Sequence, residues 1–138
     1  HGAQAIVLTG PGEEALARRI EAASPCPIVS LSGKIIPLGL LKALIKQCTV
    51  LLATDAGPRH IAAAVGTPHV AILGPTNPIF SETGVPYGVA LWEKVECAPC
   101  QLKECPTDHR CMTRLSPQAV ISALEALLEK HVRCPSYN

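Results

Sequence analysis

The sequence has 138 residues, a length typical of one domain of roughly 100–200 residues. Apolar residues make up 48% and charged residues 17%, so the chain can bury a core and lacks the charge-rich composition of a disordered segment. The 12 Lys and Arg residues nearly balance the 11 Asp and Glu residues, and only 3% of residues are aromatic. These values argue against a nucleic-acid partner, which would need a basic surface and stacking side chains.

The ends and the apolar runs of the chain bear on its location. No apolar run reaches the roughly 18 residues of a membrane-spanning helix, and the first residues lack the pattern of a secretory leader. We therefore expect no transmembrane segment and no signal peptide, and a cytoplasmic location. The first residue is His1 rather than Met, and strand-like sequence begins soon after it, so we treat the chain as a fragment of a longer protein.

Short apolar runs alternate with amphipathic segments along the chain. The apolar runs predict strands over residues 5–8, 28–31, 49–54, 69–73 and 89–92. The amphipathic segments and their flanking turn residues predict helices over residues 13–23, 38–47, 59–65 and 117–131. Because the strands are continuous apolar runs, they indicate an α/β fold with a Rossmann-like parallel sheet and helices on both faces. We expect one domain over residues 1–138, with a Cys-rich excursion at residues 93–115.

Predicted faces and caps add detail to three of these helices. In the first, Leu16 and Ile20 fall on one face, with alanine between them. In the second, residues 41, 44, 45 and 48 follow the spacing of a buried face. The last helix has Ser116 as its N-cap and an apolar stripe that includes Leu127.

In an open parallel sheet, ligands bind beyond the carboxyl ends of the strands, so the loops there are candidate sites. Residues 10–15 match a loose dinucleotide-binding pattern, but Glu13 and Glu14 at the start of the helix would repel a pyrophosphate. Residues 33–34 resemble the end of a P-loop, but Ile28 stands where the first glycine is required. We reject both interpretations.

The loop at residues 55–60 has the features of an anion site. It starts a helix whose first turn contains a flexible glycine, a proline and no acidic residue. We expect the backbone N–H groups of Ala56 and Gly57 to bind phosphate oxygens, His60 to donate a hydrogen bond, and Asp55 to accept one from a sugar hydroxyl. In the alternative interpretation, Asp55 only caps the helix and His60 only packs.

A second loop, at residues 74–78, follows the next strand. Its Thr76 and Asn77 can reach the same crevice as the loop at 55–60. Taken alone, the loop is only a rigid turn.

Residues 54–68 read Thr-Asp-Ala-Gly-Pro-Arg-His-Ile-Ala-Ala-Ala-Val-Gly-Thr-Pro, and residues 74–78 read Gly-Pro-Thr-Asn-Pro. Together they resemble the lipopolysaccharide heptosyltransferase family, glycosyltransferase family 9. The turn at residues 8–13, the turn at 31–34 and the cysteine region at 97–112 agree with the resemblance, which covers nearly the whole chain.

The resemblance implies an inverting glycosyltransferase of the GT-B type, with two Rossmann-like domains, that requires no metal or other cofactor. Such an enzyme transfers heptose from ADP-heptose, its donor, to the inner core of lipopolysaccharide, its acceptor. This chain would be the carboxyl-terminal, donor-binding half. A cytoplasmic location peripheral to the inner membrane would suit that acceptor.

The resemblance also implies roles for the two loops. Asp55 would contact the heptose, residues 56–57 and His60 would bind the diphosphate, and residues 76–77 would border the cleft. Family members often have Ser or Thr at position 56, so the side-chain contact to phosphate would be absent here. The acceptor domain with its general base, and the first strand and helix of the donor domain, would lie upstream, so we expect no transferase activity from the isolated chain.

Four cysteines, Cys97, Cys100, Cys105 and Cys111, have the spacing C-x2-C-x4-C-x5-C. This spacing favours structural zinc over disulfides in a cytosolic protein. Reduced cysteines that pack in a proline-rich loop are an equal alternative. The other cysteines, at 26, 48 and 134, are expected to be buried or incidental.

Two other functions remain open from the residues alone. One is a different sugar-nucleotide enzyme of the GT-B type, either another glycosyltransferase or a 2-epimerase. The other is a non-catalytic binding module. Preference for ADP over UDP would separate the first alternative from a heptosyltransferase.

Overall fold

Strands and helices alternate along residues 3–132, the part of the chain that this computed structural model describes. The chain divides into two compact units, His1–Pro37 and Leu38–Asn138. Each unit has its own parallel sheet, so the expected α/β class with parallel strands is confirmed. The first sheet has two strands and the second has three.

The first unit is a βαβ arrangement. Strand β1 (Ala5–Val7) pairs in parallel with β2 (Ile28–Ser30), and helix α1 (Glu14–Ala23) connects them. Ala17 is the fully buried residue of α1, whereas Leu16 and Ile20 are 50% and 42% exposed. Ala17 lies on the same face as Leu16 and Ile20, and the helix packs through this small residue.

The loop before α1 is closed by its own glutamates. The Gly10 N–H donates to Oε2 of Glu13 at 2.8 Å, and the Gly12 N–H donates to Oε1 of Glu14 at 3.2 Å. A pyrophosphate would need such amides free. The geometry supports the rejection of a dinucleotide site in this loop.

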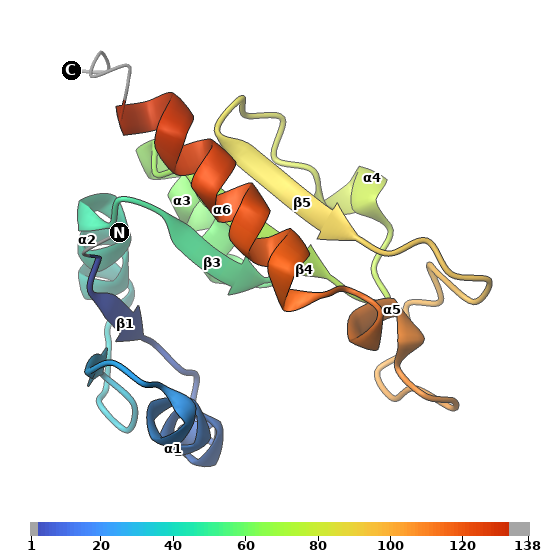
Figure 1. Cartoon of the computed structure of the whole chain (residues 1–138), viewed down its shortest axis with the longest axis horizontal. Helices are drawn as coiled ribbons and strands as arrows, with labels where there is room; N and C mark the ends of the chain where they lie inside the picture. The colour runs from blue at the N-terminus through green and yellow to red at the C-terminus, as the bar shows by residue number, and fades with distance from the viewer. Residues whose placement is uncertain (1–2, 133–138) are drawn as a thin grey trace. The chain divides into compact units, whose positions relative to one another are not determined.

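The second unit contains a three-stranded parallel sheet in the order β3-β4-β5. Its strands are β3 (Leu51–Thr54), β4 (His69–Leu73) and β5 (Gly88–Trp92). Helices α3 (Gly57–Val65) and α6 (Pro117–Val132) lie on opposite faces of this sheet (Figure 1). Four of the five β4 residues are buried, as expected for a central strand covered on both faces.

Helix α2 (Leu38–Gln47) packs beside α3 and presents the predicted apolar face, with Ile45 fully buried. The Thr67 hydroxyl fixes the end of this helix pair by donating to the Ile45 carbonyl at 2.8 Å. At the end of α3, Gly66 adopts the left-handed conformation, with φ 83°, that favours glycine after a helix. The Ala119 N–H donates to the Ser116 hydroxyl at 3.2 Å, which confirms the predicted N-cap of α6.

Two short helices were not predicted from the sequence: α4 (Pro78–Ser81) and α5 (Arg110–Thr113). Each is a single turn, too short for a 3.6-residue periodicity to be recognised. Helix α3 begins two residues earlier than predicted, because Gly57 and Pro58 already adopt helical geometry. Within residues 3–132, the helices fall short of the length and apolar character needed to cross a membrane.

Helix α6 allows a test of which of its faces stabilises the fold. Leu127 is 3% exposed and Ile121 is 49% exposed. We expect Leu127→Ala to lower the free energy of unfolding by about 2–5 kcal/mol, because it deletes buried methyl groups. Ile121→Ala, the matched control, should cost less than about 1 kcal/mol. Urea denaturation measures both; equal losses would show that the packing of α6 is assigned wrongly.

Candidate functional site

The loop between β3 and α3 brings the start of a helix to the end of a strand. Ala56 is the N-cap residue, with extended backbone angles (φ −141°, ψ 173°), and no side chain caps the helix. The first turn contains Pro58 and no acidic residue. The dipole and unpaired amides of such a helix start attract anions.

The two amides predicted to be free differ in the structure. The Ala56 N–H donates to the Thr54 carbonyl at 2.8 Å, so the expectation of a free amide at Ala56 is wrong. The local turn satisfies it. The Gly57 N–H has no hydrogen-bond partner among the described residues. Gly57 is therefore the residue of this pair that can bind an anion.

Asp55 does not cap the helix, contrary to the alternative drawn from the sequence. Its Oδ1 lies 2.8 Å from Nε of Arg59, one turn along the chain. The Nε–H is not aligned for a hydrogen bond, so the contact is an ion pair. Ser81 adds two contacts: its hydroxyl donates to Oδ2 of Asp55 at 2.9 Å, and its carbonyl accepts from Nη2 of Arg59. The Arg59 residue is 1% exposed.

This network sets the ionisation of Asp55. Partial burial by itself would raise the pKa of Asp55. Hydrogen bonds from the side chains of Ser81 and Thr76, together with the positive charges of Arg59 and His60, outweigh that effect and hold the pKa below its usual range. Asp55 is thus a carboxylate at neutral pH.

The remaining predicted residues lie around the same loop. His60 is exposed on α3, and it is near enough to Asp55 to affect its pKa. Thr76 is half-buried and contacts Asp55 through the hydrogen bond that lowers its pKa. Asn77 has a structural role, because its Oδ1 accepts from the Ile79 N–H at 3.0 Å and caps α4.

Arg59 and Ser81 were not singled out by sequence reasoning. The ion pair between Arg59 and Asp55 could have been predicted from the sequence, because the two residues are four apart at a helix start, which is the spacing of helical ion pairs. The contact between Ser81 and Asp55 could not have been predicted, because the two residues are 26 apart in the sequence. Only the fold brings it to the carboxylate.

The Cys-rich excursion packs against the loop that carries Thr76. The Gln101 N–H donates to the Pro75 carbonyl at 2.9 Å. A Cβ on Gly74 would lie 2.9 Å from Sδ of Met112, so the Met112 side chain lies directly against that glycine. These contacts connect the excursion to the end of β4.

The four clustered cysteines are free thiols, so the disulfide alternative is wrong for them. All four line one cavity of about 200 Å³. Residues 3–132 contain no group of three or more His, Cys, Asp or Glu side chains placed to hold a metal ion. The hypothesis of a structural zinc site at Cys97, Cys100, Cys105 and Cys111 is therefore not supported. Among the four, Cys111 is buried, Cys100 and Cys105 are partly buried, and Cys97 is exposed.

The thiols differ in ionisation because their surroundings differ. Burial raises the pKa of Cys111, and the neighbouring cysteines raise it further. Hydrogen bonding with Thr107, whose Oγ1 lies 3.4 Å from the sulfur, lowers the pKa of Cys105. Cys26 is exposed and Cys48 is partly buried. Cys134 lies outside the described residues.

The parallel sheet of the second unit, covered on both faces, and the helix start beyond β3 place the chain in the class of Rossmann-like α/β proteins. The profile of glycosyltransferase family 9 (heptosyltransferase) matches residues 1–110. The chain belongs to this family.

Curated relatives agree with the assignment. Lipopolysaccharide heptosyltransferase 1 of Pseudomonas aeruginosa is 35% identical over 128 residues, which is 82% of this chain and 34% of the relative. Lipopolysaccharide heptosyltransferase 3 of Escherichia coli K12 is 30% identical over 136 residues, covering 92% of this chain and 38% of the relative. The chain thus spans little more than a third of the length of these relatives.

Two solved structures share the fold. A family 9 glycosyltransferase from Veillonella parvula matches with a TM-score of 0.78 and 26% identity, over 94% of this chain and 37% of that one. The E. coli ADP-heptose heptosyltransferase II matches with a TM-score of 0.78 and 24% identity, over 94% and 38%. The expected architecture, part of a GT-B glycosyltransferase, agrees with these matches.

The ion pair predicts a pH dependence of stability. The pKa of Asp55 is lower in the folded chain, so its contribution is present above the unfolded pKa of about 3.9 and is lost as pH falls through the folded pKa. At pH 7, Asp55→Asn should lower the free energy of unfolding by about 3 kcal/mol, because Arg59 keeps a buried charge without a counterion. The difference between the native chain and the variant should shrink below about pH 4.

Urea denaturation at a series of pH values measures this difference. Glu96→Gln is the matched control, because Glu96 forms an exposed ion pair with Arg110 at 3.4 Å, and such pairs stabilise little. An Asp55→Asn variant as stable as the native chain at pH 7 would contradict the assignment.

Proposed function

We propose that this chain is the donor-binding part of a glycosyltransferase that transfers heptose from ADP-heptose to the lipopolysaccharide inner core with inversion. The observation that carries the proposal is the start of α3, where the Gly57 N–H has no partner within residues 3–132 and the first turn is free of acidic side chains. Family membership and the names of the relatives supply the sugar, the donor and the acceptor.

The diphosphate of the donor would bind at the start of α3. The Gly57 N–H would donate to a phosphate oxygen and the exposed His60 would donate a second hydrogen bond. The Ala56 N–H is held by Thr54, so its predicted contact would require that turn to open. A helix start that directs its backbone N–H groups at the diphosphate stabilises the charge that develops on the departing ADP. We propose that this replaces a bound cation and that no cofactor is required.

Asp55 would orient the heptose. A carboxylate has about four acceptor positions, and Arg59, the Ser81 hydroxyl and Thr76 each approach one of them. The remaining position can accept a hydrogen bond from a sugar hydroxyl. Thr76 and Asn77 would border the donor, with the Asn77 side-chain amino group available because only its Oδ1 is used in capping.

This chain covers only 34% and 38% of the two relatives. The acceptor site and the general base would lie in the rest of the whole protein. We accordingly propose that the chain alone binds donor without transferring sugar. We also propose a cytoplasmic location, peripheral to the inner membrane, where the acceptor is built.

Gly57 offers a direct test of donor binding. Gly57→Pro removes the N–H while keeping a backbone compatible with a first helical residue, and the preceding Ala56 is already extended, as a residue before proline prefers. We expect the ADP affinity to fall about tenfold, since one hydrogen bond to a charged group is lost. Isothermal titration calorimetry with ADP measures the change.

Gly57→Ala is the matched control, because it keeps the N–H, its Cβ meets nothing within 4 Å apart from its chain neighbours, and it places before Pro58 the same Cβ that the proline variant does. Its ADP affinity should equal that of the native chain. UDP should bind more weakly than ADP; tighter binding of UDP would favour another sugar-nucleotide enzyme. Equal affinities for the proline and alanine variants, or no ADP binding at all, would overturn the proposed site.

A further inference from the structure

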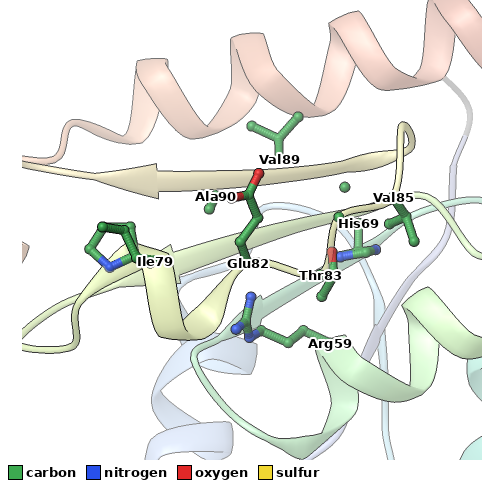
Figure 2. Close-up of a pocket in the computed structure, with 11 residues that line it drawn as sticks. Arg59, His69, Ile79, Glu82, Thr83, Val85, Val89 and Ala90 are labelled. Carbon is green, nitrogen blue, oxygen red and sulfur yellow. The ribbon is translucent and has the colours of Figure 1, made fainter.

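A second cavity, of about 300 Å³, lies in the second unit beside the segment that connects β4 to β5 (Figure 2). This connection consists of the single-turn helix α4 and an irregular segment that leads to Gly88, the first residue of β5. Four polar side chains line the cavity, namely Arg59, His69, Glu82 and Thr83. Arg59 and His69 are each 1% exposed, so the cavity has buried polar walls.

The positive charge of Arg59 is already balanced by the Asp55 carboxylate. Nε lies 2.8 Å from Oδ1 of Asp55, and Nη2 donates to the Ser81 carbonyl. The Glu82 carboxylate lines the same cavity and would repel an anion. The cavity therefore lacks the net positive charge that a phosphate or carboxylate ligand requires.

His69 supplies a hydrogen-bond acceptor. Burial, with the positive charges of Arg59 and His60, lowers the pKa of His69, although its hydrogen bond to Thr67 opposes the shift. The ring is thus neutral at pH 7. Nδ1 lies 3.2 Å from the Thr67 carbonyl, which can only accept, so Nδ1 carries the proton. Nε2 then has a lone pair, and it has no hydrogen-bond partner among the described residues.

Gly88 shapes the same wall. A Cβ at Gly88 would lie 2.8 Å from both Cε1 and Nε2 of His69 and 3.1 Å from the Thr83 hydroxyl. His69 and Thr83 therefore present their polar atoms close together, beside the start of β5, as Figure 2 shows. Aliphatic side chains complete the lining, among them Val85 and Val89.

We propose that this cavity binds one neutral, polyhydroxylated ring, a monosaccharide unit. Acceptors at His69 and Glu82, a donor at Arg59 and a hydroxyl at Thr83 match sugar hydroxyls, which both donate and accept, and the aliphatic walls match the C–H faces of the ring. The volume lies at the lower end of the roughly 300–1,000 Å³ of ligand pockets, which suits a single ring. The inference is independent of the proposed function, because Asp55, Gly57 and His60 do not line the cavity.

The proposal is tested by ¹H–¹⁵N NMR. The isotope-labelled chain is titrated with methyl α-D-mannopyranoside and, separately, with methyl α-D-glucopyranoside. We expect saturable shifts at residues 82–90 for at least one of the two. His69→Asn keeps an amide near Nδ1 but loses the acceptor at Nε2, and should bind about fivefold more weakly. His69→Gln, whose amide reaches the position of Nε2, should bind like the native chain.

Thr83→Val is a second test that leaves the buried His69 in place, and it should also weaken binding about fivefold. Glu21→Gln, on the exposed face of α1, is the control and should bind normally. A matching trisaccharide separates the two sources of the ring: binding of the trisaccharide as well indicates a saccharide chain, and binding of the methyl glycosides alone indicates a free sugar.

Three results would overturn the proposal. The first is the absence of saturable shifts at residues 82–90 with either glycoside. The second is native affinity in both His69→Asn and Thr83→Val. The third is tighter binding of inorganic phosphate or adenosine than of the glycosides at these residues. ADP binding at Gly57 is measured separately, so failure here leaves the donor site unaffected.

Discussion

The buried ion pair between Asp55 and Arg59 organises the second unit around the end of β3. An acidic residue that precedes a helix ordinarily caps it by accepting from the first amides. Here Arg59 and Ser81 hold both carboxylate oxygens of Asp55, and the helix starts without a side-chain cap. The pair therefore leaves the first turn of α3 open to a ligand while keeping a carboxylate beside it.

The loop before α1 shows the opposite solution in the same chain. There Glu13 and Glu14 accept from the amides of the preceding glycines, Gly10 and Gly12, and their negative charges at the helix start would repel an anion. Two strand-to-helix turns with similar Gly-Pro composition thus differ in chemistry because of where their charged side chains point. Arg59 also lines the 300 Å³ cavity, whereas Asp55, Gly57 and His60 do not.

Much of the fold was predictable, because short apolar runs and amphipathic helices report burial directly. The parallel strands of the second unit and the faces of α2 and α6 follow that pattern. In α1, Ala17 is the fully buried residue of the face that also carries Leu16 and Ile20, a detail that the apolar spacing does not specify. In the site, the helix start at Gly57 was visible in the sequence. The partners of Asp55 were not, since Ser81 reaches it only through tertiary folding.

A double-mutant cycle between positions 55 and 59 tests most directly whether this pair holds the site together. Asp55→Ala, Arg59→Met and the double variant are compared with the native chain by urea denaturation at pH 7. A coupling energy of about 1–3 kcal/mol is expected, because the double variant removes both charges and leaves neither unpaired. Additive losses, with a coupling below about 0.5 kcal/mol, would contradict the account.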